Sequence, residues 1–185
     1  MVNEIDYGPL SCLPGTWQGD SGRDIAPEPD GVEDNPYYET LTFEAVGDVD
    51  NAEEQTLAIV RYDQVVRRKS NDEIFHHQQG YWTWDAKTQS VCNGFTIPRR
   101  VAVLAGGTVA QTGDEIAFSV WAEKGHDEWS IIESPFMANK ASSMAFQQVL
   151  TVNGNTMRYR QTTWVDIYDQ KRFEHTDENT LVRLS

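Results

Sequence analysis

The most informative pattern of hydrophobic and polar positions lies in residues 72–85, which read Asp-Glu-Ile-Phe-His-His-Gln-Gln-Gly-Tyr-Trp-Thr-Trp-Asp. The segment is rich in aromatic residues and ends in turn residues, which is typical of a long strand. Neighbouring side chains in a strand point to opposite faces. One face therefore carries Ile74, His76, Gln78, Gly80, Trp82 and Trp84, and the other carries Phe75, His77, Gln79, Tyr81 and Thr83. Both faces mix large apolar groups with polar ones, which suits the wall of a closed barrel.

Similar segments follow one another at short spacing along the rest of the chain. Strands are predicted over residues 15–22, 37–46, 56–66, 73–84, 90–97, 100–105, 115–122, 128–133, 143–152, 156–168 and 172–184. Turn residues separate these segments, and Asn153-Gly154 is the strongest hairpin signal among them. Glycines inside the first strand indicate a sharp bend or a close approach of backbone.

Three segments do not follow the strand pattern. Residues 5–14 contain two prolines and predict a short helical turn before the first strand. Residues 23–36 hold three prolines and five acidic residues, and we expect a solvated loop there. Residues 138–145 form the one stretch that suits a short helix.

These elements predict an all-β, calycin-like fold, a single antiparallel up-and-down β-barrel of about ten strands. A meander of this length avoids exposed edges by closing on itself. We expect one domain over residues 1–185, with residues 1–14 as an N-terminal extension or cap and residues 15–185 as the barrel. A barrel of this strand number encloses more room than side chains fill, which predicts a ligand cavity.

Composition narrows the range of partners. The 15 basic and 29 acidic residues give a net charge of −14, which argues against nucleic acids and anionic membranes because these are bound by clustered Lys and Arg. No run of apolar residues is long enough for a membrane span, and the start of the chain lacks the features of a secretory signal. The two cysteines, Cys12 and Cys92, have no metal-site spacing and are expected to be buried free thiols in a reducing, cytoplasmic environment.

Several short segments, in their order along the chain, resemble the nitrobindin family of small haem-binding β-barrels, which share the architecture of fatty-acid-binding proteins. Residues 15–22, Gly-Thr-Trp-Gln-Gly-Asp-Ser-Gly, resemble the family's opening motif G-T-W-x-G-x-G. Residues 38–43 are similar to its second strand, residues 76–82 resemble its H-x-E-x-G-Y segment with Gln78 in place of Glu, and residues 157–159 resemble its penultimate strand.

The resemblance implies a ferric haem b held by one histidine and able to meet nitric oxide or peroxynitrite, with haem-dependent isomerisation of peroxynitrite as the corresponding enzyme activity. His175 lies where the family's last strand carries the iron ligand, and His76 corresponds to the distal side. Thr16, Trp17 and Arg158 complete the set of candidate cofactor-binding residues. The sequence departs from the family in the polar residues after His175 and in segments 23–36 and 134–142, which look longer.

The residues themselves leave alternatives open. His175 could instead be a hydrogen-bonded wall residue tied to Asp177 or Glu174, whereas His126 lies in a turn where it is expected to be solvated. The six tryptophans could belong to the core or line a flat ligand.

Besides the haem-binding barrel, two functional readings follow from the same residues. A haem-free carrier of a fatty acid or another small hydrophobic molecule would anchor the ligand carboxylate through an arginine such as Arg158 or Arg160 together with a tyrosine. A third reading is a barrel whose cavity is filled by its own loops. A homodimer is compatible with all three, and motifs of other enzyme classes are absent from the sequence.

Overall fold

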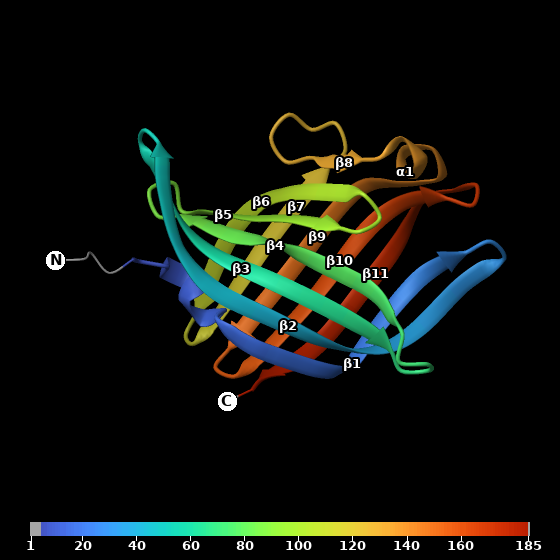
Figure 1. Ribbon diagram of the computed structural model, residues 1–185, viewed down its shortest axis with the longest axis horizontal. Helices are drawn as coiled ribbons and strands as arrows, with labels where there is room; N and C mark the ends of the chain where they lie inside the picture. Colours follow the sequence, from blue (N-terminus) through green and yellow to red (C-terminus); the bar gives the residue numbers. More distant parts are fainter. Residues whose placement is uncertain (1–4, 185) are drawn as a thin grey trace.

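The computed structural model describes residues 5–184, and in this range eleven antiparallel strands form one sheet that closes into a barrel (Figure 1). The strands are β1 (Gly15–Glu28), β2 (Gly31–Ala52), β3 (Gln55–Arg68), β4 (Ile74–Asp85), β5 (Ser90–Ile97), β6 (Val101–Thr112), β7 (Glu115–Glu123), β8 (Ile131–Glu133), β9 (Ala141–Asn153), β10 (Thr156–Ile167) and β11 (Gln170–Arg183). Ten strands form the wall, in which β1 pairs with β11 and β7 with β9, while β8 pairs with the end of β6. The predicted all-β, up-and-down barrel of about ten strands is confirmed.

The prediction of a loop over residues 23–36 is wrong, because β1 and β2 continue through this segment as one long hairpin. Proline lacks an N–H and is tolerated where a strand has no partner on one side. Pro27 lies beyond Ile25, the last β1 residue that pairs with β11. Pro36 pairs with β1 but lies beyond Tyr37, where pairing of β2 with β3 begins.

A short helix is present near its predicted place but starts earlier, as α1 (Pro135–Lys140). Ser134 caps it by accepting a hydrogen bond from the backbone N–H of Met137, and a proline at its first position is pre-set for the helical backbone. Residues 141–145, predicted as helix, instead open β9. In the described part of the chain, no helix has the length and hydrophobicity that a membrane crossing requires.

One end of the barrel is closed by the 3-10 turn η1 (Gly8–Cys12), which confirms the predicted N-terminal turn (Figure 1). Leu10 and Leu13 are fully buried, and the Trp17 indole donates a hydrogen bond to the Leu13 carbonyl at 2.8 Å. Gly8 has a φ of +50°, and a Cβ there would lie 2.5 Å from the Trp84 indole, so only glycine fits. Cys12, at the end of this turn, is a free thiol and half-buried rather than fully buried, as is Cys92.

The interior of the barrel changes character along its axis, and β11 illustrates the order. Its inward residues run from Leu181, fully buried next to η1, through Asn179 and Asp177 to His175. The apolar core therefore fills the closed end, a polar layer follows, and the opposite end of the barrel remains hollow.

Candidate functional site

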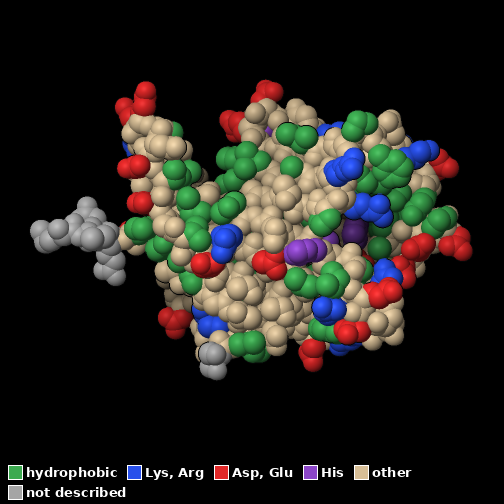
Figure 2. Space-filling model, viewed as in Figure 1, with side chains coloured by type: hydrophobic (Ala, Val, Ile, Leu, Met, Phe, Trp, Pro, Cys, Tyr) green, Lys and Arg blue, Asp and Glu red, His purple; other side chains and the backbone are tan. Residues whose placement is uncertain are grey.

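The hollow end of the barrel contains a cavity of about 560 Å³, which lies within the size range of small-molecule sites. Most of its wall surface is apolar, although many polar and charged side chains also line it. The apolar lining residues include Val66, Phe75, Phe95, Ile97, Val101, Val103, Ile131, Met137, Phe146 and Val165. Figure 2 shows a recessed histidine on the outer face of the molecule, bordered by hydrophobic and basic side chains.

The two segments that looked too long for the family form part of this wall. The β1–β2 hairpin contributes Asp24, Pro27 and Asn35, and α1 contributes Phe136 and Met137. They cover the cavity from two sides and leave the space open, so the reading in which loops fill the barrel is wrong.

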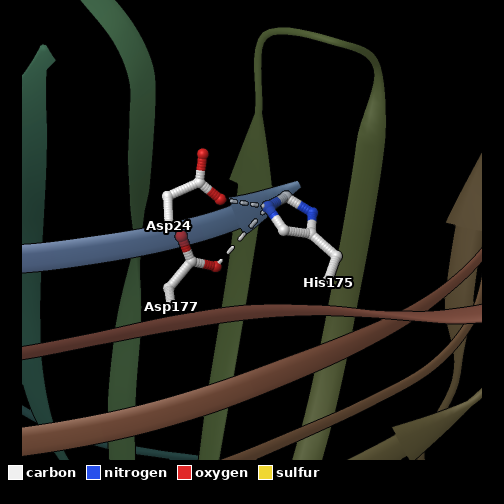
Figure 3. A group of neighbouring side chains, drawn as sticks. All are labelled: Asp24, His175 and Asp177. Atoms are coloured by element: carbon white, nitrogen blue, oxygen red, sulfur yellow. Dashed lines mark hydrogen bonds and ion pairs between the residues drawn. The ribbon is translucent and has the colours of Figure 1, made fainter. Parts of the chain in front are cut away.

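A cluster of Asp24, His175 and Asp177 lies on the cavity wall (Figure 3). Strand pairing produces it, because Asp24 of β1 is the direct partner of Asp177 of β11. His175 Nε2 lies 2.6 Å from Asp24 Oδ1 and 3.9 Å from Asp177 Oδ2. The imidazole thus faces two carboxylates of which one, Asp24, is only 3% exposed.

Both carboxylates also accept hydrogen bonds from buried amide side chains. The Asn35 amide donates to Asp24 Oδ2 at 3.2 Å, and the Gln161 amide donates to Asp177 Oδ2 at 3.0 Å. Further donations, from Gln148 to Gln161 and from Asn93 to Gln148, extend this chain of amides across the barrel. The orientation of the carboxylates is therefore fixed by buried side chains rather than by solvent.

The electrostatics of the cluster favour a charged imidazole. Burial disfavours imidazolium, but the hydrogen bond with Asp24 and the charges of Asp177 and Asp24 outweigh it, so the pKa of His175 is raised. Burial and the nearby Asp24 charge raise the pKa of Asp177, although His175 opposes this. A positive ring next to two adjacent acids relieves the repulsion that their direct pairing would otherwise cause.

His76 also lines the cavity, from β4, whereas its neighbour His77 points outward and contacts Asp63 at 2.9 Å. The prediction that His76 and His77 lie on opposite faces of the strand is confirmed. Burial lowers the pKa of His76, so this ring favours the neutral form. The remaining histidine, His126, lies in the predicted turn but is half-buried, because its ring packs edge-on against Trp121. Its Nδ1 accepts backbone N–H groups of that turn.

At the start of β4 the predicted faces are reversed for two residues. Val66 of β3 pairs with His76 while Arg67 pairs with Ile74, so Phe75 is an extra residue in a bulge. Phe75 consequently lines the cavity, and Ile74 is 52% exposed.

The floor of the cavity is a polar layer centred on Glu39. This buried carboxylate accepts hydrogen bonds from Gln64 Nε2 at 2.7 Å, Asn179 Nδ2 at 2.7 Å and Tyr159 Oη at 2.9 Å. Tyr159 Oη in turn lies 2.6 Å from the hydroxyl of Tyr37, which borders the cavity. Burial raises the pKa of Glu39 to about 7 despite its three donors.

A bulge in β1 makes room for this layer. Pairing of β1 with β2 shifts between Gly19 and Gly22. A Cβ at Gly22 would lie 2.1 Å from the ring of Tyr37, so the absence of a side chain lets the tyrosine pack against β1. The bend predicted from the glycines is confirmed.

Three predicted site residues lie elsewhere. Trp17 is fully buried in the apolar core at the closed end, and Thr16 precedes it in β1. Arg158 is exposed on the outer face of β10, with Tyr159 facing inward. None of the three is a lining residue of the cavity, so of the predicted set the fold brings only His76 and His175 together.

The tryptophans divide between the core and the outer surface. Trp17, Trp82 and Trp84 are buried, whereas Trp121 is 40% exposed. No tryptophan is among the described residues that line the cavity, whose aromatic groups are phenylalanines and tyrosines.

Sequence reasoning missed four residues of the site: Asp24, Tyr37, Glu39 and Arg68. Asp24 and Arg68 were assigned to a loop and a turn. No alternation of polar and apolar residues runs through Arg23-Asp24-Ile25-Ala26, so the position of Asp24 follows only from the pairing of β1 with β11.

Several side chains here are suited to hold a metal or cofactor. The nearest ligand atoms of Asp24, His175 and Asp177 lie within 4.8 Å of one another. His175 Nε2 is engaged by Asp24, whereas its Nδ1 makes no hydrogen bond with any residue of the described range. Imidazole nitrogens are common ligands of iron, including haem iron.

Comparisons with known proteins agree with this geometry. The family described as "THAP4-like, heme-binding beta-barrel domain" matches residues 6–183. The crystal structure of Rv2717c from M. tuberculosis superposes with a TM-score of 0.73 and 21% sequence identity, covering 97% of this chain and 100% of that one, a likeness that shows the fold alone. No curated protein matches the sequence.

Proposed function

Because the chain belongs to the THAP4-like, haem-binding β-barrel domain family, we propose that it binds ferric haem b in the cavity, with His175 as the residue that holds the iron. The family agrees with the resemblance of the sequence motifs to the nitrobindin family. The observation that carries this proposal is that His175 and His76 line the same cavity from different strands.

The lining residues fit a haem in three respects. The space is about 560 Å³, its walls are largely apolar, and one imidazole is held by a carboxylate. Histidines that ligate metals usually donate their other ring N–H to such a group, which fixes the tautomer and the direction of the ring. Asp24 is suited to this role because Asn35 holds it in turn.

The protein's own contribution would be to orient the bound group and to exclude water from the pocket. Phe95, Phe146 and the valines of the wall exclude water, and His76, with its lowered pKa, offers a neutral imidazole to a second ligand. Haem bound in this way would supply iron with a position open to nitric oxide or peroxynitrite. Isomerisation of peroxynitrite is the enzyme activity that this reading supports.

Titration of the purified protein with hemin tests the proposal. We expect a sharp Soret band that His175→Ala abolishes and His76→Ala shifts without removing. His77→Ala is the matched control, because this adjacent histidine faces outward and should leave the spectrum unchanged. A spectrum that does not respond to His175→Ala would contradict the proposal.

One observation favours a second candidate, a haem-free carrier of a small amphiphilic molecule. His175 Nε2 is held by Asp24 at 2.6 Å, and the net effect of its surroundings favours imidazolium, which cannot bind iron. A carrier would be supported by a fatty acid that co-purifies with the protein, detected by mass spectrometry, together with the absence of a Soret band after hemin is added.

A further inference from the structure

We propose that Arg68, supported by Arg99 and Lys140, binds the carboxylate of the ligand at the mouth of the cavity. The ligand class is an amphiphile with an apolar body and at least one carboxylate, which includes both haem, through its propionates, and fatty acids. The inference rests on the proposed function only in that the ligand occupies this cavity.

Arg68 carries the proposal because its side chain is positioned but unpaired. Its guanidinium lies over the Phe75 ring, 5.0 Å from the ring centre, and its Nε is buried. Within residues 5–184 this Nε finds no hydrogen-bond acceptor. Buried donors in native proteins almost always have a partner, and a charged donor left without one is costly. Since Arg68 lines the cavity, a ligand there is the acceptor that its position calls for.

The backbone around Arg68 is fixed, so the side chain does not depend on a mobile loop. Its N–H donates to the Glu73 carbonyl at 3.0 Å, and its own carbonyl accepts from the Asp72 N–H at 2.9 Å. Stacking on Phe75 then restricts the guanidinium plane. A planar guanidinium held in one orientation is suited to a bidentate contact with a carboxylate.

Two further cations border the same cavity from separate elements. Arg99 lies in the turn between β5 and β6, and Lys140 is the last residue of α1. Neither of them, nor Arg68, forms an ion pair with an acidic residue of the described range. Both are exposed, so they would add attraction rather than a fixed contact.

Acidic residues occupy the other parts of the lining and define where the carboxylate can lie. Glu28 and Glu33 of the β1–β2 hairpin border the cavity, and Asp24 and Asp177 lie next to His175. Glu28 and Glu33 would repel a ligand carboxylate, and the charge of His175 is already met by Asp24 and Asp177. Arg68, Arg99 and Lys140 are the lining cations without an acidic partner in the described range, so we expect the carboxylate beside Arg68.

Comparison of hemin with hemin dimethyl ester tests the inference, since the ester lacks the carboxylates and keeps the porphyrin and iron. We expect the unmodified protein to bind hemin roughly tenfold or more tightly than the ester, because a hydrogen bond to a charged group contributes a factor of this size to the affinity. Arg68→Ala should remove this preference by weakening hemin alone. Arg67→Ala is the matched control, because the neighbouring guanidinium instead contacts the Asp72 carbonyl, and it should leave both affinities unchanged.

A second pair of probes, dansylaminoundecanoic acid and its methyl ester, separates the inference from the haem proposal. If hemin does not bind but the fatty acid binds in an Arg68-dependent way, the haem proposal fails and this inference stands. If hemin binds through His175 but each acid and its ester bind equally, the haem proposal stands and this inference is overturned. If neither acid binds, both are overturned. The ester comparison on the unmodified protein needs no variant, so a folding defect in Arg68→Ala cannot obscure the result.

Discussion

Replacing Glu39 with glutamine should change how the stability of the barrel depends on pH. Glu39 is 2% exposed and accepts three hydrogen bonds in the polar layer, from Gln64, Tyr159 and Asn179. Glutamine keeps one oxygen for Tyr159 and Asn179, and Gln64 can turn its amide so that its oxygen accepts from the new NH₂ group. The substitution therefore removes the ionisation and retains the packing.

The sign follows from the proton on this carboxyl group. In the unfolded chain Glu39 loses its proton near its ordinary pKa of 4.5, whereas in the folded protein it keeps the proton up to a pKa of about 7. Between these values the folded state binds more protons, so stability falls as pH rises. A pKa difference of this size lowers the unfolding free energy of the wild type by about 3 kcal/mol as the pH rises. Glu39→Gln has no carboxyl group at this position and should not show this fall.

Urea unfolding followed by tryptophan fluorescence, from about pH 5 to about pH 8, measures this difference directly. The other perturbed groups, among them His76, His175 and Asp177, are present in both proteins and largely cancel in the comparison. Glu44→Gln is the matched control, because Glu44 lies on the same strand, faces outward and pairs with Arg61. Parallel pH profiles of the wild type and Glu39→Gln would refute the reasoning.

Three further predictions concern stability and use the same unfolding assay. Trp17→Ala should cost about 3–5 kcal/mol, because this fully buried indole lies in the core, and it should leave hemin affinity unchanged. Gly107→Ala should cost about 1–3 kcal/mol, since its Cβ would lie 1.8 Å from a backbone oxygen, whereas Gly31→Ala, with open space around it, should be neutral. Lys124→Met should cost about 3 kcal/mol, because the Glu133 side chain, 1% exposed, would lose its cation.

The barrel could be predicted from the sequence because local signals agreed with one another. Alternating strands separated by turn residues specify a meander, and a long meander of this kind closes. The error over residues 23–36 arose from composition. Pro27 and Pro36 suggested a loop, but each occupies a place where its strand lacks a partner on one side, and that depends on where the neighbouring strands end.

The candidate site was only partly predictable, since its members come from distant parts of the chain. His76 and His175 could be named from the resemblance to the nitrobindin family, whereas alternation alone only placed His76 and His77 on opposite faces of their strand. The contact of His175 with Asp24 depends on the pairing of β1 with β11, which joins residues 151 positions apart. The proposed role of Arg68 depends on its contact with Phe75, which a bulge turns inward. No local sequence pattern predicted that bulge.

The polar layer explains how one barrel can be both stable and hollow. Apolar side chains in place of Glu39, Gln64 and Tyr159 would avoid the cost of burying a carboxylate. They would, however, leave the floor of the cavity apolar, with no hydrogen-bonding groups. The layer is instead satisfied within itself, so the closed end packs around Trp17 without support from a ligand. Substitutions near Trp17 should therefore change stability alone, whereas substitutions in the layer should change stability and ligand affinity together, because Gln64 and Tyr159 also line the cavity.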